Sequence, residues 1–424
     1  MGKDYQPRLI DGYLKEVFPQ VPAIEIYGAK AVGKTSSARR WASSTIALDT
    51  AEGKELIQGG RSVLAQQKKP LLLDEWQRVP PSWDMVRRLV DDDNSPGQYL
   101  LTGSAVPQGV NLHSGAGRIV RLQMRPLSLQ ERNLEPPVVR ICDLLVRELG
   151  SVSGATEISL PDYLREITRS GFPGLRTYSD RAIALELDGY LENIIQKEFP
   201  EQGLLVRKPD ILKGWLRAYA SATASTASYQ SILSAATPGD AQKPSKKTTT
   251  TYRDVLDSLW ITDRVDAWLP TVNTMTSLGQ SPKHFLVDPA LSARLLRTSF
   301  SRLLRGVSSK TLGPQHGSLA GRLFESLVAQ SLKVYAQIND AELRHFRDAK
   351  NGWEIDFIIE RDDVVLAIEV KMAAAATDDD AKRINWLKKN CDGYSVVGMI
   401  INTGSTAYTR KDGVHVIPAV LLGA

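Results

Sequence analysis

An eight-residue loop, Gly-Ala-Lys-Ala-Val-Gly-Lys-Thr, occupies residues 28–35 directly after the apolar run 23–27. It fits the phosphate-binding pattern G-x-x-x-x-G-K-[ST], which needs a strand before it and a helix after it. A helix is expected from Ser36 to Trp41, so that backbone N–H groups and the positive helix N-terminus would surround a polyphosphate. The loop therefore predicts an α/β fold with a phosphate site between its first strand and helix.

The residues of this loop have expected roles in binding a nucleotide and Mg²⁺. The Lys34 ammonium would reach the β and γ phosphates, and the Thr35 hydroxyl would bind Mg²⁺. The remaining nucleotide contacts are expected from the rest of the loop and the start of the helix, which comprise Gly28, Ala29, Lys30, Ala31, Val32, Gly33 and Ser36.

A second apolar run, 70–73, leads into the acidic pair Asp74 and Glu75. An unbroken apolar run is typical of a buried parallel strand, and open α/β sheets bind ligands at the C-terminal ends of their strands. Asp74 would bind Mg²⁺ through water, and Glu75 would act as the base that orients the attacking water. The alternative is that Asp74 and Glu75 are an ordinary acidic strand end without a role in catalysis. The phosphate-binding pattern upstream makes this alternative the weaker of the two.

A third strand, 99–101, ends in Thr102 and Ser104 around a glycine. Either hydroxyl could sense the γ-phosphate by hydrogen bonding to it and to the lytic water, although Thr-Gly-Ser is also good turn chemistry. Arg118, before a fourth strand at 119–122, is a candidate for the arginine that neutralises transition-state charge. A solvated surface arginine is the alternative there.

Two predicted strands near the C-terminus, 353–359 and 364–371, would form a hairpin. Because side chains alternate with period two, Glu369 and Lys371 project from the same face. Asp356, followed after a hairpin by Glu-x-Lys, is the core of the PD-(D/E)xK nuclease pattern. The C-terminal part is therefore predicted to be an α/β nuclease-like domain.

An amphipathic helix expected at 321–328 adds Glu325, the helix acid that such nucleases often use. Asp356, Glu369 and Glu325 would then hold one or two divalent metals, while Lys371 would orient and acidify a water for phosphodiester attack. Alternating charges on an exposed strand also produce this pattern, and such a fold can serve as a scaffold without cleavage. Both alternatives stay open.

The middle of the chain is predicted to be helical. Apolar residues at helical spacing predict one helix over 183–195. A winged-helix pattern of three helices and a strand follows, at 211–220, 229–236, 245–259 and 260–265. Lys243, Lys246 and Lys247 crowd the start of its third helix, where recognition helices meet DNA. A packing module with solvated lysines is the alternative to DNA binding.

Composition sets outer bounds on the function. The 424 residues suffice for two or three domains, and the net charge of +5 permits nucleic-acid contact without establishing it. The two distant cysteines, Cys142 and Cys391, suit a reducing compartment. No signal peptide is evident, and no run approaches the roughly 20 apolar residues that cross a bilayer. We therefore expect a cytoplasmic, soluble protein with no membrane partner.

The order of loop, acidic strand end and polar strand end resembles the AAA-type ATPases, and three further segments resemble a large prokaryotic family. Its members join such an ATPase to a C-terminal region of unknown function with a nuclease-like fold. The similar segments are 124–131, with its PLS-x-x-E stretch, 170–174, similar to Gly-Gly-Phe-Pro, and 283–291, similar to K-x-Y-F-x-D-x-G-L. Ser170 and Ala290 replace glycines of the family pattern. The resemblance covers nearly the whole chain and implies ATP as ligand, Mg²⁺ as its metal and ATP hydrolysis.

We therefore expect an AAA-type ATPase domain with a parallel sheet (1–135), a helical connecting region (136–205), a winged-helix-like domain (206–275) and a nuclease-like domain (276–424). Nucleotide state would move the C-terminal half, on DNA or elsewhere. The alternatives are an ATP-regulated, metal-dependent nuclease and a nucleotide-gated DNA-binding or regulatory module without useful turnover. Because AAA-type proteins often place an arginine in a neighbour's site, Arg118 could act in cis or in trans. A homo-oligomer and a monomer both stay open.

Overall fold

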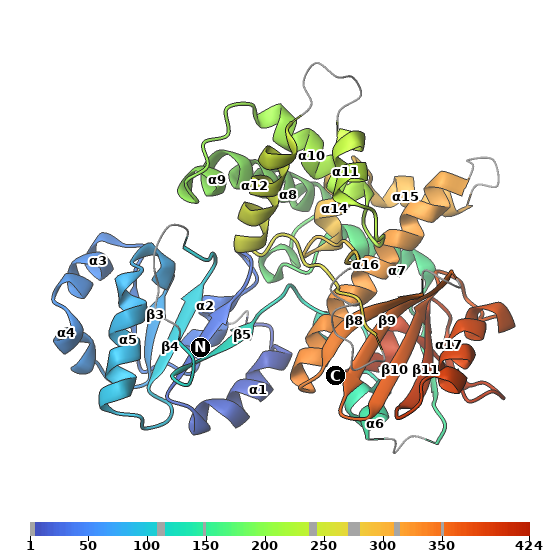
Figure 1. Ribbon diagram of the computed structural model, residues 1–424, viewed down its shortest axis with the longest axis horizontal. Helices are drawn as coiled ribbons and strands as arrows, with labels where there is room; N and C mark the ends of the chain where they lie inside the picture. The colour runs from blue at the N-terminus through green and yellow to red at the C-terminus, as the bar shows by residue number, and fades with distance from the viewer. Residues whose placement is uncertain are drawn as a thin grey trace.

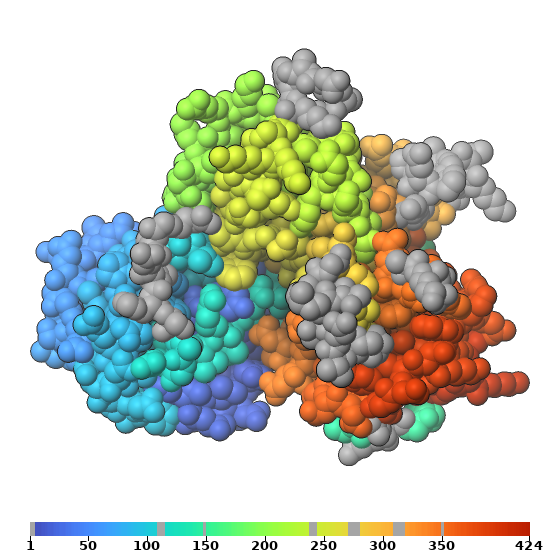
Figure 2. Space-filling model, viewed as in Figure 1, coloured from blue at the N-terminus to red at the C-terminus, as the bar shows by residue number. Residues whose placement is uncertain are grey.

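The computed structural model describes residues 5–107, 115–146, 150–236, 244–269, 280–308, 314–348 and 352–424. Figure 1 shows three parts, which we name by their described residues: an N-terminal body (5–133, blue to cyan), a helical body (160–308, green to light orange) and a C-terminal body (314–424, orange to red). In the space-filling view the helical body lies against both others (Figure 2).

The N-terminal body is built on a five-stranded sheet in the order β2-β3-β4-β1-β5. Its strands are β1 (Ala23–Tyr27), β2 (Ser44–Ala47), β3 (Leu71–Asp74), β4 (Tyr99–Gly103) and β5 (Ile119–Gln123). All neighbouring pairs run parallel, which confirms the parallel sheet expected from the sequence. Both faces are covered, as a parallel sheet requires, so β3 and β4 are buried along their whole length.

The helices of the N-terminal body are α1 (Leu9–Val17), α2 (Lys34–Arg39), α3 (Ala51–Gln58), α4 (Arg61–Ala65) and α5 (Pro81–Asp92). One face of the sheet packs on α5, where Leu71 and Leu73 join Trp83 and Val86 in one apolar cluster. The other face contributes Ile26 to a cluster that continues into the helical body. The parallel sheet therefore shares its core with the helices that follow it.

The helical body contains α7 (Leu160–Arg169), α8 (Asp180–Asn193), the π-helix η5 (Ile194–Glu198), α9 (Phe199–Glu201), α10 (Pro209–Ser221), α11 (Tyr229–Ala236), α12 (Lys246–Ser258), α14 (Pro289–Leu295) and α15 (Phe300–Ser308). The four helices expected from the sequence are thus present. The strand-like segment 260–265 forms isolated antiparallel bridges to Leu286 and Lys283 and not a continuous ladder. Lys243 lies outside the described residues, and the winged-helix identity stays a prediction.

The segment 136–205, expected to be a helical connection, also contains two short strands. The strand β6 (Val139–Arg140) leads into α6 (Ile141–Leu145), and β7 (Ser153–Ala155) follows. Both strands pair with the C-terminal body, β6 with β14 (Leu422–Gly423) and β7 with β12 (Thr406–Thr409). This part of the chain therefore completes a distant sheet as well as linking two bodies.

The C-terminal body is a seven-stranded mixed sheet in the order β7-β12-β13-β11-β10-β9-β8. Its remaining strands are β8 (Glu342–Asp348), β9 (Trp353–Arg361), β10 (Val364–Val370), β11 (Ser395–Asn402) and β13 (His415–Pro418). The helix α16 (Pro314–Ile338) covers one face and α17 (Asp378–Asn390) covers the other. The predicted hairpin is confirmed, because Arg361 pairs with Val364 across a two-residue turn. Within the described ranges, no helix is long and apolar enough to cross a membrane.

Candidate functional site

The loop 28–35 leaves β1 at the C-terminal edge of the N-terminal sheet and enters α2. Gly28 has φ of 149°, and a Cβ there would lie 2.1 Å from the Met124 carbonyl oxygen, so only glycine fits. Gly33, with φ of 101°, turns the chain into the helix, which begins at Lys34 and not at Ser36 as expected. Both glycines of the pattern are therefore required by this backbone.

Lys34, the next-to-last residue of the loop, has a buried side chain that points into the loop. Its Nζ donates to the carbonyl oxygens of Gly28 at 3.0 Å and Ala29 at 2.8 Å. Burial lowers the pKa of the Lys34 ammonium to about 8, against the opposing attraction of Glu75 and Asp74. The ammonium is therefore held by two carbonyl groups of the loop, with which a bound polyphosphate would compete.

Asp74, at the end of β3, joins the loop to the neighbouring strand. Its Oδ1 accepts hydrogen bonds from the Thr35 hydroxyl at 2.7 Å and from the Thr102 hydroxyl at 2.5 Å. The Arg39 guanidinium lies 3.6 Å from the other carboxylate oxygen. A hydroxyl and a carboxylate are the hard oxygen ligands that Mg²⁺ takes beside phosphates, so these residues fit the expected metal.

Glu75 is held by a separate set of contacts. Its backbone has φ of 56°, and its N–H donates to the Thr102 hydroxyl at 3.1 Å. Its carboxylate accepts from the Ser104 hydroxyl at 2.7 Å and from the Gln77 amide at 2.5 Å. Thr102 thus fixes Asp74 and the backbone of Glu75, whereas Ser104 contacts the Glu75 side chain. Sequence reasoning missed Gln77, whose position two residues after Glu75 was the only available signal.

The outer side of the loop faces the helical body across a cavity of about 240 Å³. Lys30 forms an ion pair with Glu198 of η5, and the Tyr190 hydroxyl donates to the Lys30 carbonyl at 3.4 Å. Lys197 and Ser104 also line the cavity. Of the other predicted nucleotide contacts, Ala29 and Val32 are buried, whereas Ala31 and Ser36 are exposed. The loop is therefore accessible from the side of the helical body.

Arg118 is not near this site within one chain. It precedes β5, whose first residue, Ile119, pairs with Ala23 at the start of β1. The loop follows the far end of β1, roughly 16 Å away at about 3.3 Å per residue. The Arg118 guanidinium instead contacts Asp91 at 2.7 Å. A role in cis is therefore not supported, and a role in a neighbouring chain stays a prediction.

The second predicted site contains a lysine that sequence reasoning left without a role. The Lys283 Nζ lies 2.8 Å from Glu325, 3.0 Å from Asp356 and 3.4 Å from Glu354. Its side chain is only 1% exposed. Although burial would lower it, the three carboxylates raise the pKa of Lys283. Sequence separations of 42 and 73 residues from Glu325 and Asp356 concealed this contact.

Glu369 and Lys371 pair with each other beside this cluster, at 2.9 Å. Burial and the nearby Asp356 raise the pKa of Glu369 to about 7, and its Oε1 is buried with no hydrogen-bond partner. Burial and Asp356 also raise the pKa of Glu325 to about 8. The metal site predicted at Asp356, Glu369 and Glu325 is not assembled, because the ammonium of Lys283 lies between two of the three acids. In the part of the chain that the structure describes, no group of three or more His, Cys, Asp or Glu side chains could hold a metal.

The segment 124–131 connects the loop to the C-terminal body. The guanidinium of Arg8 donates to the Val32 carbonyl of the loop at 2.7 Å and to the Glu131 carboxylate at 2.9 Å. The N–H groups of Leu129 and Gln130 lie outside the sheets and donate to side chains of α16, Ser331 and Tyr335, each at 3.0 Å. Arg8, which sequence reasoning also missed, is therefore the link between the loop and this segment.

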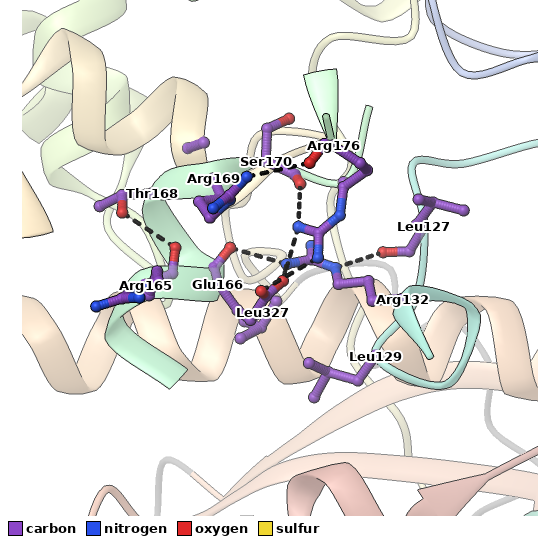
Figure 3. Close-up of polar contacts among 12 residues, drawn as sticks. Leu127, Leu129, Arg132, Arg165, Glu166, Thr168, Arg169, Ser170, Arg176 and Leu327 are labelled. Atoms are coloured by element: carbon purple, nitrogen blue, oxygen red, sulfur yellow. Dashed lines mark hydrogen bonds and ion pairs between the residues drawn. The ribbon is translucent and has the colours of Figure 1, made fainter. Parts of the chain in front are cut away.

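A buried charge cluster joins the same segment to the turn at 170–174. Figure 3 shows the guanidiniums of Arg132 and Arg176 meeting at Glu166, with contacts of 2.9 and 2.8 Å to the same carboxylate oxygen. Burial would raise the pKa of Glu166, but the two arginines lower it. Arg176 also donates to the Ser170 carbonyl at 3.2 Å. Residues that flank the two family-like segments therefore meet through side chains that are buried or nearly so, which suits a structural role.

Comparisons with known proteins agree with this division of the chain. Residues 20–133 match the model of a family described as an AAA domain. Residues 160–302 and 320–422 match two families described as domains of unknown function, DUF8612 and DUF4143.

Two relatives carry no assigned activity. They are the uncharacterized protein Rv2008c of Mycobacterium tuberculosis and the uncharacterized protein Mb2031c of Mycobacterium bovis, and the chain is 23% identical to each over 337 residues. Each match covers 78% of this chain and 68% of the relative. The N-terminal body is therefore similar to AAA domains, which supports an ATP-binding protein of the AAA type, and the rest resembles domains without a known function.

Proposed function

We propose that the protein binds Mg-ATP at the loop 28–35 and hydrolyses it, and that the bound nucleotide changes how the helical and C-terminal bodies pack against the N-terminal body. The observation that carries the proposal is the meeting of three strand ends. Thr35, Asp74 and Thr102 are joined by contacts of 2.7 and 2.5 Å, beside a Glu75 that is held by Ser104. The groups to which we assign binding and catalysis thus lie at one edge of the sheet.

Binding would begin with the exchange of partners at Lys34. The β and γ phosphates would take the place of the Gly28 and Ala29 carbonyls as acceptors for its ammonium, and backbone N–H groups of the loop would donate to the same phosphates. With a pKa of about 8, Lys34 is roughly nine-tenths protonated at pH 7. Mg²⁺, held by Thr35 and through water by Asp74, would neutralise phosphate charge when bound.

Hydrolysis requires a base that is separate from the metal ligand. Glu75 meets this requirement, because its carboxylate contacts Ser104 and Gln77 and not the Thr35 hydroxyl. It would accept the proton of the water that attacks the γ-phosphorus as the bond to the bridging oxygen of ADP breaks. Ser104 and Gln77 would position the carboxylate for this transfer.

Coupling to the rest of the chain is supported by contacts that start at the loop itself. Arg8 joins the Val32 carbonyl to Glu131, and the neighbouring Leu129 N–H contacts Ser331 of α16. On the other side, the Val106 N–H after β4 donates to the Ser258 carbonyl at the end of α12, at 3.0 Å. A change in the loop or at the end of β4 would therefore act directly on α16 and α12.

The proposal is tested by Lys34→Ala, with Lys54→Ala on the exposed surface of α3 as the matched control. Two charge-assisted contacts to phosphate, at about 1.5–3 kcal/mol each, predict a loss of at least about 100-fold in Mg-ATP affinity. Titration with a fluorescent ATP analogue would measure it. Equal affinities of the Lys34→Ala variant and the control would reject the assignment of the loop.

The two other functions suggested by the sequence have less support. A metal-dependent nuclease is not favoured, because Lys283 occupies the acidic cluster. Lys246 and Lys247 are exposed at the start of α12, as contact with DNA phosphates would require, but so are many surface lysines. DNA binding therefore stays a prediction, which salt-dependent binding of a duplex to the wild type and to Lys246→Ala/Lys247→Ala would test.

A further inference from the structure

The acidic cluster of the C-terminal body lies at its contact with the helical body. Glu325 projects from α16, and Glu354 and Asp356 project from β9, whereas Lys283 belongs to the segment that follows residue 279 in the helical body. The lysine thus reaches from one body into a group of acids on another.

The backbone around Lys283 is fixed on both sides. Lys283 and Val265 exchange backbone hydrogen bonds of 2.8 and 3.0 Å, and the His284 N–H donates to the Ser225 carbonyl at 2.9 Å. The Lys283 side chain is 1% exposed, and its Nζ lies 5.3 Å from the centre of the Phe357 ring. The ammonium is therefore enclosed at the contact between the two bodies.

The three N–H bonds of the ammonium have acceptors within reach. Glu325 and Asp356 accept at 2.8 and 3.0 Å, and Glu354 lies at 3.4 Å. Two of the three ammonium donors are therefore used in hydrogen bonds, and Glu354 adds an ion pair. Asp356 also accepts the Val370 N–H at 2.9 Å with its second oxygen. The carboxylate oxygens that a divalent metal would need are therefore engaged by a cation that is part of the chain.

We propose that Lys283 is a permanent internal cation of this cluster, which takes the place of a divalent metal and ties the helical body to the C-terminal body. A metal at the same position would sit within hydrogen-bonding distance of the ammonium and be repelled by it. The remaining acid, Glu369, is already paired with Lys371. The nuclease-like arrangement is therefore an ion-pair contact between the helical and C-terminal bodies and not a metal centre.

The segment that carries Lys283 also contacts the turn 170–174 of the helical body. Five residues after Lys283, the buried Asp288 accepts the Gly171 N–H at 2.7 Å and the Ser170 hydroxyl at 3.0 Å. Pro173, in the same turn, is among the groups closest to Gly33 of the loop. The segment 283–288 therefore spans the distance between the acidic cluster and a turn that touches the nucleotide loop.

The experiment measures Mn²⁺ binding to the full chain without nucleotide, by the loss of the free-ion electron paramagnetic resonance signal, together with thermal unfolding. The wild-type protein is expected to have no Mn²⁺ site that is lost when Asp356 is replaced. Lys283→Ala is expected to unfold at a lower temperature and to gain one Mn²⁺ site that restores much of the loss. Adding Glu325→Gln to this variant should remove the site.

Lys333→Ala is the matched control, because Lys333 is also a buried lysine of the core whose Nζ contacts a single carboxylate, Asp263, at 2.6 Å. This variant should be destabilised without gaining a Mn²⁺ site. Asp263 is a single carboxylate that remains paired with Arg125, and such a group does not bind Mn²⁺. A folded Lys283→Ala variant that gains no Mn²⁺ would overturn the proposal.

A second measurement decides the question even where Lys283→Ala does not fold. Mn²⁺ binding by the wild type that is lost in Asp356→Asn would show that the cluster holds a metal beside Lys283, and would reject the proposal. Mn²⁺ bound near the nucleotide loop is recognised by its loss in Asp74→Asn. Neither outcome depends on whether the loop hydrolyses ATP.

Discussion

Replacing Thr102 by Val tests which of two neighbouring hydroxyls supports the nucleotide site. The Thr102 hydroxyl donates to Asp74 at 2.5 Å and accepts from the Glu75 N–H at 3.1 Å, and the side chain is fully buried. Valine keeps the shape and removes both contacts. One bond to a carboxylate, worth about 2 kcal/mol, and one neutral bond, worth about 1 kcal/mol, together predict about 3 kcal/mol of lost stability.

Thr102→Ser is the matched control, because it keeps the hydroxyl and removes one methyl group, at a cost of about 1 kcal/mol. Denaturant unfolding of both variants and of the wild type measures the difference. Since Thr102 acts through Asp74, Thr102→Val should also weaken Mg-ADP and Mg-ATP by similar factors. Equal stability of the two variants would refute the bridging role, and a selective loss of Mg-ATP would show that Thr102 senses the γ-phosphate itself.

Three further predictions concern residues around the same loop. Ser104→Ala should lower ATP turnover by about tenfold with little change in Mg-ATP affinity, because its hydroxyl contacts the Glu75 carboxylate and no loop residue; an unchanged rate would contradict this role. Arg8→Met should lower the free energy of unfolding by about 3–5 kcal/mol, because it leaves the Glu131 carboxylate buried without its cationic partner. The control Arg61→Met removes an exposed ion pair with Asp92 and should change the free energy of unfolding by less than about 0.5 kcal/mol. Burial lowers the pKa of Lys34 to about 8, so the ammonium loses its proton above that pH. Mg-ATP affinity should therefore fall about fivefold between pH 8 and pH 9. The Lys34→Arg variant should not show this fall, because arginine keeps its charge.

Local sequence patterns were sufficient to predict the strands β1, β3, β4, β5, β9 and β10. Mostly apolar runs marked β1, β3 and β4, because parallel strands are buried on both faces. Alternation along β9 marked the hairpin that it forms with β10. The predicted proximity of Thr35 to Asp74 follows from the same reasoning, since the ends of parallel strands share one edge of a sheet. These features depend on residues close in sequence or on the direction of a strand.

The contacts that sequence reasoning missed join residues far apart in the chain. Arg8 and Glu131 are 123 residues apart, and Lys283 and Asp356 are 73 residues apart. Their pairing depends on how segments that are distant in the chain pack together, which no local periodicity encodes. The same is true of β7, whose partner β12 lies about 250 residues later, and of Arg118, whose position depends on the place of β5 in the sheet.

ATP hydrolysis at this site is tested by the rate of phosphate release by the wild type and by Glu75→Gln at saturating Mg-ATP. The amide introduced by this substitution would keep the shape of the Glu75 side chain but could not accept a proton. We therefore expect a loss of at least about 100-fold in rate, with Mg-ATP affinity retained. Equal rates would contradict the assignment of Glu75 as the base. A wild-type rate that is already negligible would contradict hydrolysis itself and leave a nucleotide-gated binding module.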